Sequence, residues 1–186
     1  MTTAVLTDQL AGLTPGTWTV DPAHSRVGFV ARHLMISKVR GNFGRFSGTV
    51  EIDPDPTRSS LHAEVDTASV GTGDESRDAH LRSADFFDVE AYPTMSLRST
   101  AVRADGDRLT LAGELTIKDV TAPVELALEF DGVETDPWGG TRAGFSAVAE
   151  VNRRDFGLEW NVALDSGGML VGEKVRIELD VELVRA

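Results

Sequence analysis

Strict alternation of apolar and polar residues is the feature that most narrows the folds open to this chain. The C-terminal stretch EKVRIELDVELV, residues 173–184, places an apolar side chain at every second position from Val175 to Leu183. Because successive side chains of a strand point to opposite faces, the stretch predicts a strand with one apolar and one polar face. The pattern recurs, and it predicts about eight such strands: SRVGFVARHL, FSGTVEID, LHAEVDTA, TMSLRST, RLTLAGELTIKD, VELALEF, AGFSAVAEV and the C-terminal stretch.

A single internal helix is predicted, in DESRDAHLRSADFF, with Asp74 as its N-cap. One helix cannot cover eight strands that are each apolar on one face. The apolar faces must therefore cover each other, in a closed antiparallel barrel or in a sandwich. We see no repeat and no second domain in the sequence.

The size of the inward residues bears on whether such a barrel is solid or hollow. Small residues occupy the apolar faces of several strands, and they either leave space or pack against large partners. Periodicity leaves both interpretations open. A hollow apolar barrel would suit a long hydrocarbon, since about 20 buried carbons contribute roughly 16 kcal/mol before ordering costs are subtracted. The small residues are Ala31, Ala63, Gly113, Ala143, Ala147 and Ala149.

Charge and cysteine content exclude several classes of function. The chain has 18 Lys and Arg residues against 30 Asp and Glu residues, a formal net charge of -12. A surface for phosphates needs clustered cations, so nucleic acid is not an expected partner. This balance also disfavours an anionic membrane surface, although a local basic patch would escape the average. Because the chain has no cysteine, disulfides, thiolate metal sites and cysteine nucleophiles are excluded.

The N-terminal residues 1–16 are expected to form a flexible arm, with a short helix from Thr7 to Leu13 that ends at Pro15 and Gly16. Residues 17–186 are expected to form a single domain. The arm lacks the basic and apolar regions of a secretory signal, and no stretch approaches the roughly 20 apolar residues that cross a bilayer. The sequence therefore predicts a cytoplasmic protein without stable membrane insertion.

One segment, HLRSADFFDVEAYPT at residues 80–94, resembles the signature of the YceI-like family. The resemblance extends from about Trp18 to Leu183. It includes the segments WTVDPAHSRVGFVARHL, GNFGRFSG, GELTIKDVTAPVEL, DPWGGTRAGF and NRRDFGLEWN in the family's order. It implies an all-β fold with a minor helix: an eight-stranded antiparallel lipocalin-like barrel, with one helix packed beside it. It also implies a long cavity for a polyisoprenoid, an isoprenoid quinone or a similar lipid, and a possible homodimer.

The alternation and the resemblance together predict a set of ligand-binding residues. Most are inward-facing apolar residues, and His33, Phe156 and Trp160 are expected nearer the polar end of the ligand. The predicted set is Phe29, His33, Phe46, Val65, Leu97, Leu115, Leu128, Phe145, Phe156, Trp160 and Ile177.

Several polar residues have both a structural and a functional interpretation. His33 could contact a ligand or bond to a backbone carbonyl within the core, and His24 is expected to brace the turn before its strand. Arg82 and Asp85 are spaced for an ion pair that would fix the helix to the barrel. Arg153 could meet an anionic head group, with Asp155 as its more favoured partner.

No catalytic or metal-binding motif is legible. The four histidines form neither HxH nor HExxH, and there is no GxSxG. The prediction is therefore a non-enzymatic lipid-binding protein without a cofactor or metal. Two alternatives stay open. One is an enzyme that acts on such a lipid with His33 or His80 as acid or base, and the other is a filled barrel that binds a protein partner.

Overall fold

The computed structural model describes residues 2–186, with side chains from residue 4 onward. It contains two α-helices, α1 (Thr2–Gln9) and α2 (Glu75–Arg82), among the described residues. Its strands are β1 (Gly16–Val20), β2 (Arg26–His33), β3 (Ser37–Phe43), β4 (Phe46–Ile52), β5 (Ser60–Asp66), β6 (Val70–Gly71), β7 (Thr94–Asp105), β8 (Arg108–Ile117), β9 (Val120–Thr135), β10 (Thr141–Asn152) and β11 (Val171–Arg185).

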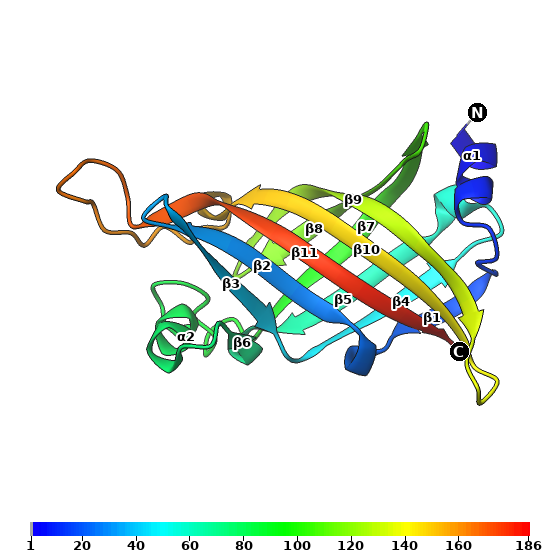
Figure 1. Cartoon of the computed structure of the whole chain (residues 1–186), viewed down its shortest axis with the longest axis horizontal. Coiled ribbons are helices and arrows are strands. Elements are labelled where there is room, and N and C mark those ends of the chain that lie inside the picture. Colours follow the sequence, from blue (N-terminus) through cyan, green and yellow to red (C-terminus); the bar gives the residue numbers. More distant parts are fainter. Residues whose placement is uncertain (1) are drawn as a thin grey trace.

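Eight of the strands close into an antiparallel barrel (Figure 1). Their order is β1-β4-β5-β7-β8-β9-β10-β11, and pairing between β1 and β11 closes the ring. The predicted architecture and strand number are thus confirmed. Closure removes the unpaired strand edges that an open sheet would leave.

Two short strands, β1 and β2, pair with successive parts of the long strand β11. β1 and β2 follow one another along β11, with the 3-10 turn η1 (Pro22–His24) between them. β4 pairs with β1, whereas β3 pairs with β2 and with the two-residue strand β6. β2 and β3 therefore continue the barrel wall toward the end where α2 lies (Figure 1).

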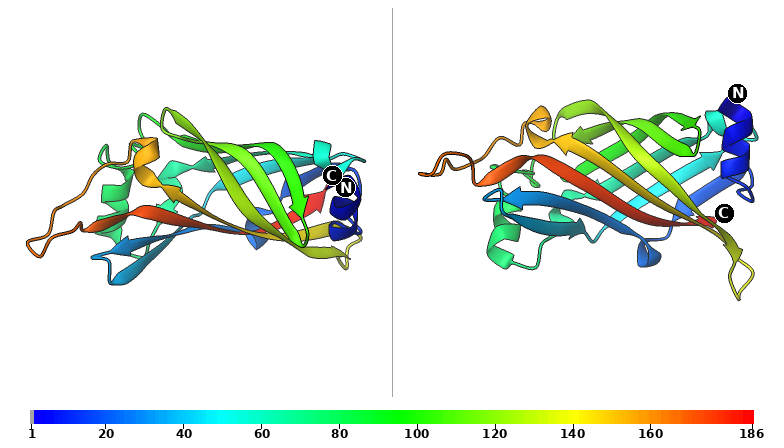
Figure 2. Two further views of the ribbon diagram at one scale, coloured as in Figure 1. Left: turned by 90° about the horizontal axis from the view of Figure 1, so that it is seen from above. Right: turned by 45° about the horizontal axis from the view of Figure 1, so that its top comes forward.

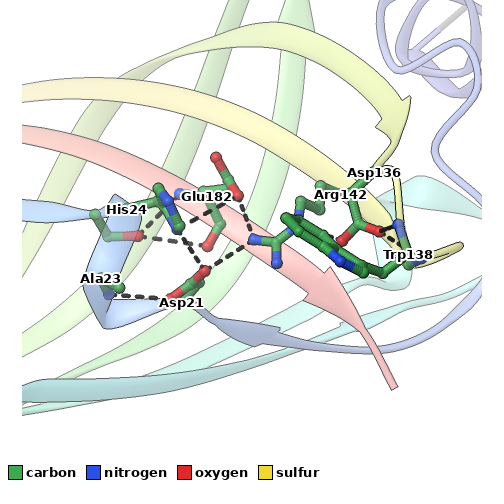
Figure 3. Close-up of polar contacts among 9 residues, drawn as sticks. Asp21, Ala23, His24, Asp136, Trp138, Arg142 and Glu182 are labelled. Atoms are coloured by element: carbon green, nitrogen blue, oxygen red, sulfur yellow. Dashed lines mark hydrogen bonds and ion pairs between the residues drawn. The ribbon is translucent and has the colours of Figure 1, made fainter.

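The joint between β1 and β2 is held by a polar network on the outside of the barrel (Figure 3). Asp21 caps η1 by accepting a hydrogen bond from the Ala23 amide, and its other oxygen lies 2.8 Å from His24 Nδ1. Arg142 donates from Nη1 to Asp21 and Glu182, and from Nε to Asp136. The predicted role of His24 in bracing this turn is confirmed.

The C-terminal strand β11 follows the predicted alternation. Ile177 and Leu179 lie on the lumen of the barrel, as do Val175, Val181 and Leu183. Glu178 faces outward, where Arg176 donates to its carboxylate at 3.1 Å. One residue of register shift would place this whole apolar set in water, which is why the alternation fixes the pairing.

The two helices lie at opposite ends of the barrel (Figure 1). α2 begins where predicted, because Asp74 accepts a hydrogen bond from the Arg77 amide and caps the helix. α1 spans Thr2–Gln9 and not the predicted 7–13, because Leu6 is fully buried while Gly12 takes a positive φ of 92° that ends helical geometry. α1 contacts β7, and Gln9 donates to the Gly106 carbonyl.

Membrane-spanning length is not reached by either helix: within the described residues, no helix is both long and apolar enough to cross a bilayer.

Candidate functional site

The barrel lumen contains two apolar cavities. Cavity 1, of about 220 Å³, lies at the α2 end, where Leu81, Phe86 and Phe87 line it. Cavity 2, of about 160 Å³, lies at the α1 end, where Leu10 and Leu13 of the N-terminal arm line it. The barrel is therefore hollow at both ends and not filled throughout by its own side chains.

A shared ring of six residues separates the two cavities, and we call it the waist. Each of the six lines both cavities, so the cavities abut inside one lumen. The waist consists of Val27, Ala63, Val65, Leu97, Leu126 and Leu179.

Nine of the eleven predicted ligand-binding residues lie on the lining. Val65 and Leu97 belong to the waist. The others divide between the cavities: Phe29, Leu115, Phe156 and Ile177 line cavity 1, and Phe46, Leu128 and Phe145 line cavity 2. The two-residue alternation along the strands predicted this inward position, and the role of these residues in binding a ligand stays a prediction.

His33 and Trp160 lie outside the lining of both cavities. His33 is the last residue of β2, and its position pairs with Ser37 and Val171 at the end of the barrel wall. Trp160 packs on the outside of the α2 end, with its ring centre 4.5 Å from that of His80 and 5.5 Å from that of Phe86. Both residues therefore lie near the mouth of cavity 1 and not within it.

The small inward residues serve both of the roles left open by the sequence. Ala31, Ala63 and Ala147 line the cavities, whereas Ala143 packs with Trp18 in a dense cluster. Gly41 makes room in another way: a Cβ there would overlap the ring of Phe29, which lies directly over the glycine. Gly113 and Ala149 do not line either cavity.

Among the side chains that the structure describes, Arg153 is the one charged side chain on the lining. It is buried, and its Nε and Nη1 donate to the carbonyls of Gly172 and Leu158 at 2.9 and 2.6 Å. Burial lowers the pKa of Arg153. The expected pair with Asp155 is wrong, since the guanidinium points inward to backbone carbonyls while Asp155 is exposed on the outside.

The expected ion pair between Arg82 and Asp85 is also wrong. Arg82 reaches across to the barrel and donates to the carbonyls of Ala68 and Val70. Asp85 lies 2.8 Å from His80 Nε2 instead. The expected role of Arg82, fixing the helix to the barrel, is thus performed through backbone carbonyls.

His80 is half-buried, and its ring contacts those of Phe86 and Trp160, which also contact each other. It does not line the lumen. Neither histidine proposed as an acid or base therefore faces the space in which an apolar substrate would lie.

One group of potential metal ligands occurs among the described residues: Asp21, His24 and Glu182. Arg142 already donates to both carboxylates (Figure 3). Its charge offsets one of the two negative charges of the group, and the hydrogen bonds from His24 and Arg142 lower the pKa of Asp21 to about 2. The arrangement is that of an ion-pair network at a strand joint.

Sequence reasoning missed the contribution of the N-terminal arm to the lining. Leu10 and Leu13 line cavity 2 together with Pro56 of the turn η2 (Pro56–Arg58). Their signal was the spacing of Leu6, Leu10 and Leu13, which places three apolar residues on one side of a helical segment.

Comparisons with known proteins agree with this architecture. The model of the YceI-like domain matches residues 18–183. Protein YceI of Escherichia coli O157:H7 is 41% identical over 137 residues, which are 73% of this chain and 72% of that protein. The crystal structure of Burkholderia cenocepacia BcnA matches with a TM-score of 0.74 and 25% identity, over 88% of this chain and 98% of that one.

A more distant structure shares the fold. It is described as a polyisoprenoid binding domain from Saccharophagus degradans implicated in plant cell wall breakdown, and it matches with a TM-score of 0.69 at 16% identity. The match covers 91% of this chain and 98% of that domain. From the sequence relatives, the family model and the barrel itself, we conclude that this chain belongs to the YceI-like family.

Proposed function

We propose that this protein binds a long apolar ligand, such as a polyisoprenoid or an isoprenoid quinone, in the barrel lumen and sequesters or transports it without chemical change. The observation that carries the proposal is the pair of abutting apolar cavities along the barrel. The description of the Saccharophagus degradans neighbour as a polyisoprenoid binding domain supports an isoprenoid tail. The apolar lining would stabilise a tail by about 0.8 kcal/mol for each methylene that it buries.

The proposed orientation places the polar end of the ligand near cavity 1. Arg153 is the charged group closest to the lumen there. Three of its five N–H donors are committed to the carbonyls of Gly172, Leu158 and Val171, which leaves two for a head group. Cavity 2 offers only hydroxyls as side-chain polar groups, such as Ser47 and Ser146. A head group that accepts hydrogen bonds is therefore better served at the α2 end.

The test is organic extraction of the purified protein followed by mass spectrometry, with two matched variants. Ala63→Phe fills the waist, whereas Ala127→Phe makes the same change on the exposed outer face of β9. We expect the amount of a long lipid recovered with Ala63→Phe to fall at least about tenfold, because a blocked waist removes several methylenes from burial. We expect Ala127→Phe to match the unmodified protein.

Circular dichroism of both variants controls for the fold. Recovery of no lipid from the unmodified protein, or equal recovery from both variants, would contradict the proposal.

Catalysis on a bound lipid is the second candidate. It predicts that the His33→Ala or His80→Ala variant retains the lipid but leaves it unconverted. Identical extracted species from these variants and from the unmodified protein would leave binding as the function. The open lumen speaks against the third candidate, a filled barrel that acts only through a protein partner.

The homodimer and the cytoplasmic location are parts of the same proposal. Light scattering of the purified protein tests the first, and fractionation of cells that express the full-length gene tests the second.

A further inference from the structure

The exposed apolar side chains of this protein gather at one end of the barrel. Six large apolar side chains are exposed among the residues whose side chains are described, and four of them lie at the α2 end. Met35 and Ile36 are 61% and 81% exposed at the turn between β2 and β3, and Val162 and Met169 are 46% and 48% exposed on the loop before β11. Both views in Figure 2 place this turn and this loop at the same end.

The turn and the loop are joined to each other. The Leu34 amide donates to the Leu170 carbonyl at 2.8 Å, and the Leu170 amide donates to Val162. Val171, the next residue, pairs with His33 and lines cavity 1. The exposed apolar residues are thus continuous with the wall at the mouth of cavity 1. We call Leu34, Met35, Ile36, Val162 and Met169 the apolar tip.

The backbone at the tip is in a costly conformation. Leu34 and Met35 have φ values of 53° and 60°, in the region that favours Gly and Asn. The Ile36 amide donates to the His33 carbonyl and closes a turn with Leu34 and Met35 as its two central residues, within the three-residue connection between the paired positions His33 and Ser37. Two large apolar residues stand here instead and project into water, which points to a contact made by their side chains.

The β2–β3 side of the tip carries cations in a chain that is otherwise acidic, whereas Asp165 is exposed on the loop between Val162 and Met169. Between Asp21 and Glu51 the sequence contains no Asp or Glu, but it contains Arg26, Arg32, Lys38, Arg40 and Arg45. Arg32 and Lys38 are exposed and lie directly opposite each other on β2 and β3. Like charges in that position repel, and within residues 4–186 neither makes an ion pair with a carboxylate.

We infer that the apolar tip, with Arg32 and Lys38 behind it, is a docking surface for an anionic lipid bilayer. The two cations would lie at the level of the lipid head groups while Met35 and Ile36 enter the interface. This inference goes beyond the proposed function, and it adds a route: a ligand would leave the bilayer next to the mouth of cavity 1.

A second copy of the chain fits this surface less well. A symmetric contact through the tip would bring Arg32 and Lys38 of one copy toward the same cations of the other. A bilayer with anionic lipids complements both the charge and the apolar residues. A dimer through the tip is therefore an outcome that the experiment must separate.

The experiment measures co-sedimentation of the protein with vesicles of phosphatidylcholine mixed with phosphatidylglycerol, and with vesicles of phosphatidylcholine alone. We expect binding to the anionic vesicles, and we expect it to weaken with added salt. The variant Arg32→Glu with Lys38→Glu should bind at least about tenfold more weakly, because each cation near such a surface contributes about fivefold to binding.

The matched control reverses two exposed cations at the other end, Arg103→Glu with Arg108→Glu, and changes the net charge equally. It should bind like the unmodified protein. For the apolar part, Met35→Asn with Ile36→Ser retains a turn-compatible residue and should weaken binding about tenfold. Trp138→Ser, which removes an 87% exposed side chain at the opposite end, should have no effect.

Three results would overturn the inference: no binding of the unmodified protein to anionic vesicles, equal loss in the two charge variants, or a dimer in light scattering that the tip variant dissociates while vesicles stay unbound. The lipid extracted from each variant separates this inference from the proposed function. If lipid is extracted but the protein does not bind vesicles, only the docking surface is contradicted. If the protein binds vesicles but yields no extracted lipid, only the proposed ligand is contradicted.

Discussion

The two ends of the barrel each hold an arginine, and the two arginines are used in opposite ways. At the α1 end, Arg142 lies among the carboxylates of Asp21, Asp136 and Glu182, which raise its pKa (Figure 3). At the α2 end, Arg153 is buried against backbone carbonyls, and burial lowers its pKa. The charge of Arg142 is neutralised by carboxylates, whereas Arg153 forms no ion pair within residues 4–186.

Buried side chains also differ in whether they line a cavity. Near the α1 end, Trp18 is fully buried beside Ala143, and neither residue lines either cavity of the lumen, although Leu183 of the same cluster lines cavity 2. At the α2 end, Phe156 is nearly fully buried but also lines cavity 1. The comparison teaches that burial alone does not separate a side chain packed in the core from one that lines a cavity, because the lumen itself counts as interior.

The largest effect is expected from truncating these two aromatic side chains. Trp18→Ala and Phe156→Ala should each lower the free energy of unfolding by about 3–5 kcal/mol, since each leaves an apolar cavity. Urea denaturation measures this loss. Only Phe156→Ala should also change the amount of lipid extracted from the protein. An equal change in extracted lipid for both variants would remove the distinction between the ends.

A smaller effect is expected from the two arginines. Arg153→Met should lower the free energy of unfolding by about 2–4 kcal/mol, because the Gly172 and Leu158 carbonyls lose their donors inside the protein. Arg142→Met should also destabilise, but less, because water reaches the carboxylates that it leaves.

Urea denaturation at low and high salt tests the comparison of the arginines. Added salt should shrink the effect of Arg142→Met and leave that of Arg153→Met unchanged. If salt altered both effects alike, the two sites would be electrostatically equivalent.

The smallest effect is expected in the dependence of stability on pH. The hydrogen bonds from His24 and Arg142 hold the pKa of Asp21 at about 2, below its ordinary value of 3.8. The folded state therefore favours the charged carboxylate: the stabilisation is present above pH 3.8 and is lost as the pH falls toward 2. It amounts to at most about 2 kcal/mol, with a discount for solvent.

Thermal unfolding across this pH range measures the contribution. Asp21→Asn should flatten the acid limb of the stability curve. Asp155→Asn, which alters an exposed carboxylate at the other end, should keep the limb of the unmodified protein. An unchanged limb in Asp21→Asn would show that the network does not act through this carboxylate.

Alternation predicted the barrel and most of its lining because both depend on the direction of side chains along a strand. It could not predict that Arg142 donates to Asp21 at the turn between β1 and β2, since that contact depends on which strands lie side by side in the sheet. It placed His33 inside because it assumed that the alternation holds to the end of the strand. At the last residue of β2, the side chain lies at the end of the barrel wall and no longer lines the lumen.

Polar partners were the least predictable part of the site. Arg82 and Arg153 both had a carboxylate within three residues in the sequence, and both donate instead to carbonyls of distant or buried backbone. Backbone carbonyls carry no sequence signal of their own. A long side chain therefore finds a partner that only the folded chain supplies.

The waist has a consequence for how quickly a ligand can exchange. A ligand short enough to occupy one cavity would leave by the nearer end of the barrel, and the two cavities would hold two such ligands separately. On the proposed function, a tail that extends past Ala63 and Leu97 would occupy both cavities and would have to pass the waist lengthwise before it is released. The residence time of the ligand should therefore rise more steeply than its tail length once the tail is long enough to occupy both cavities.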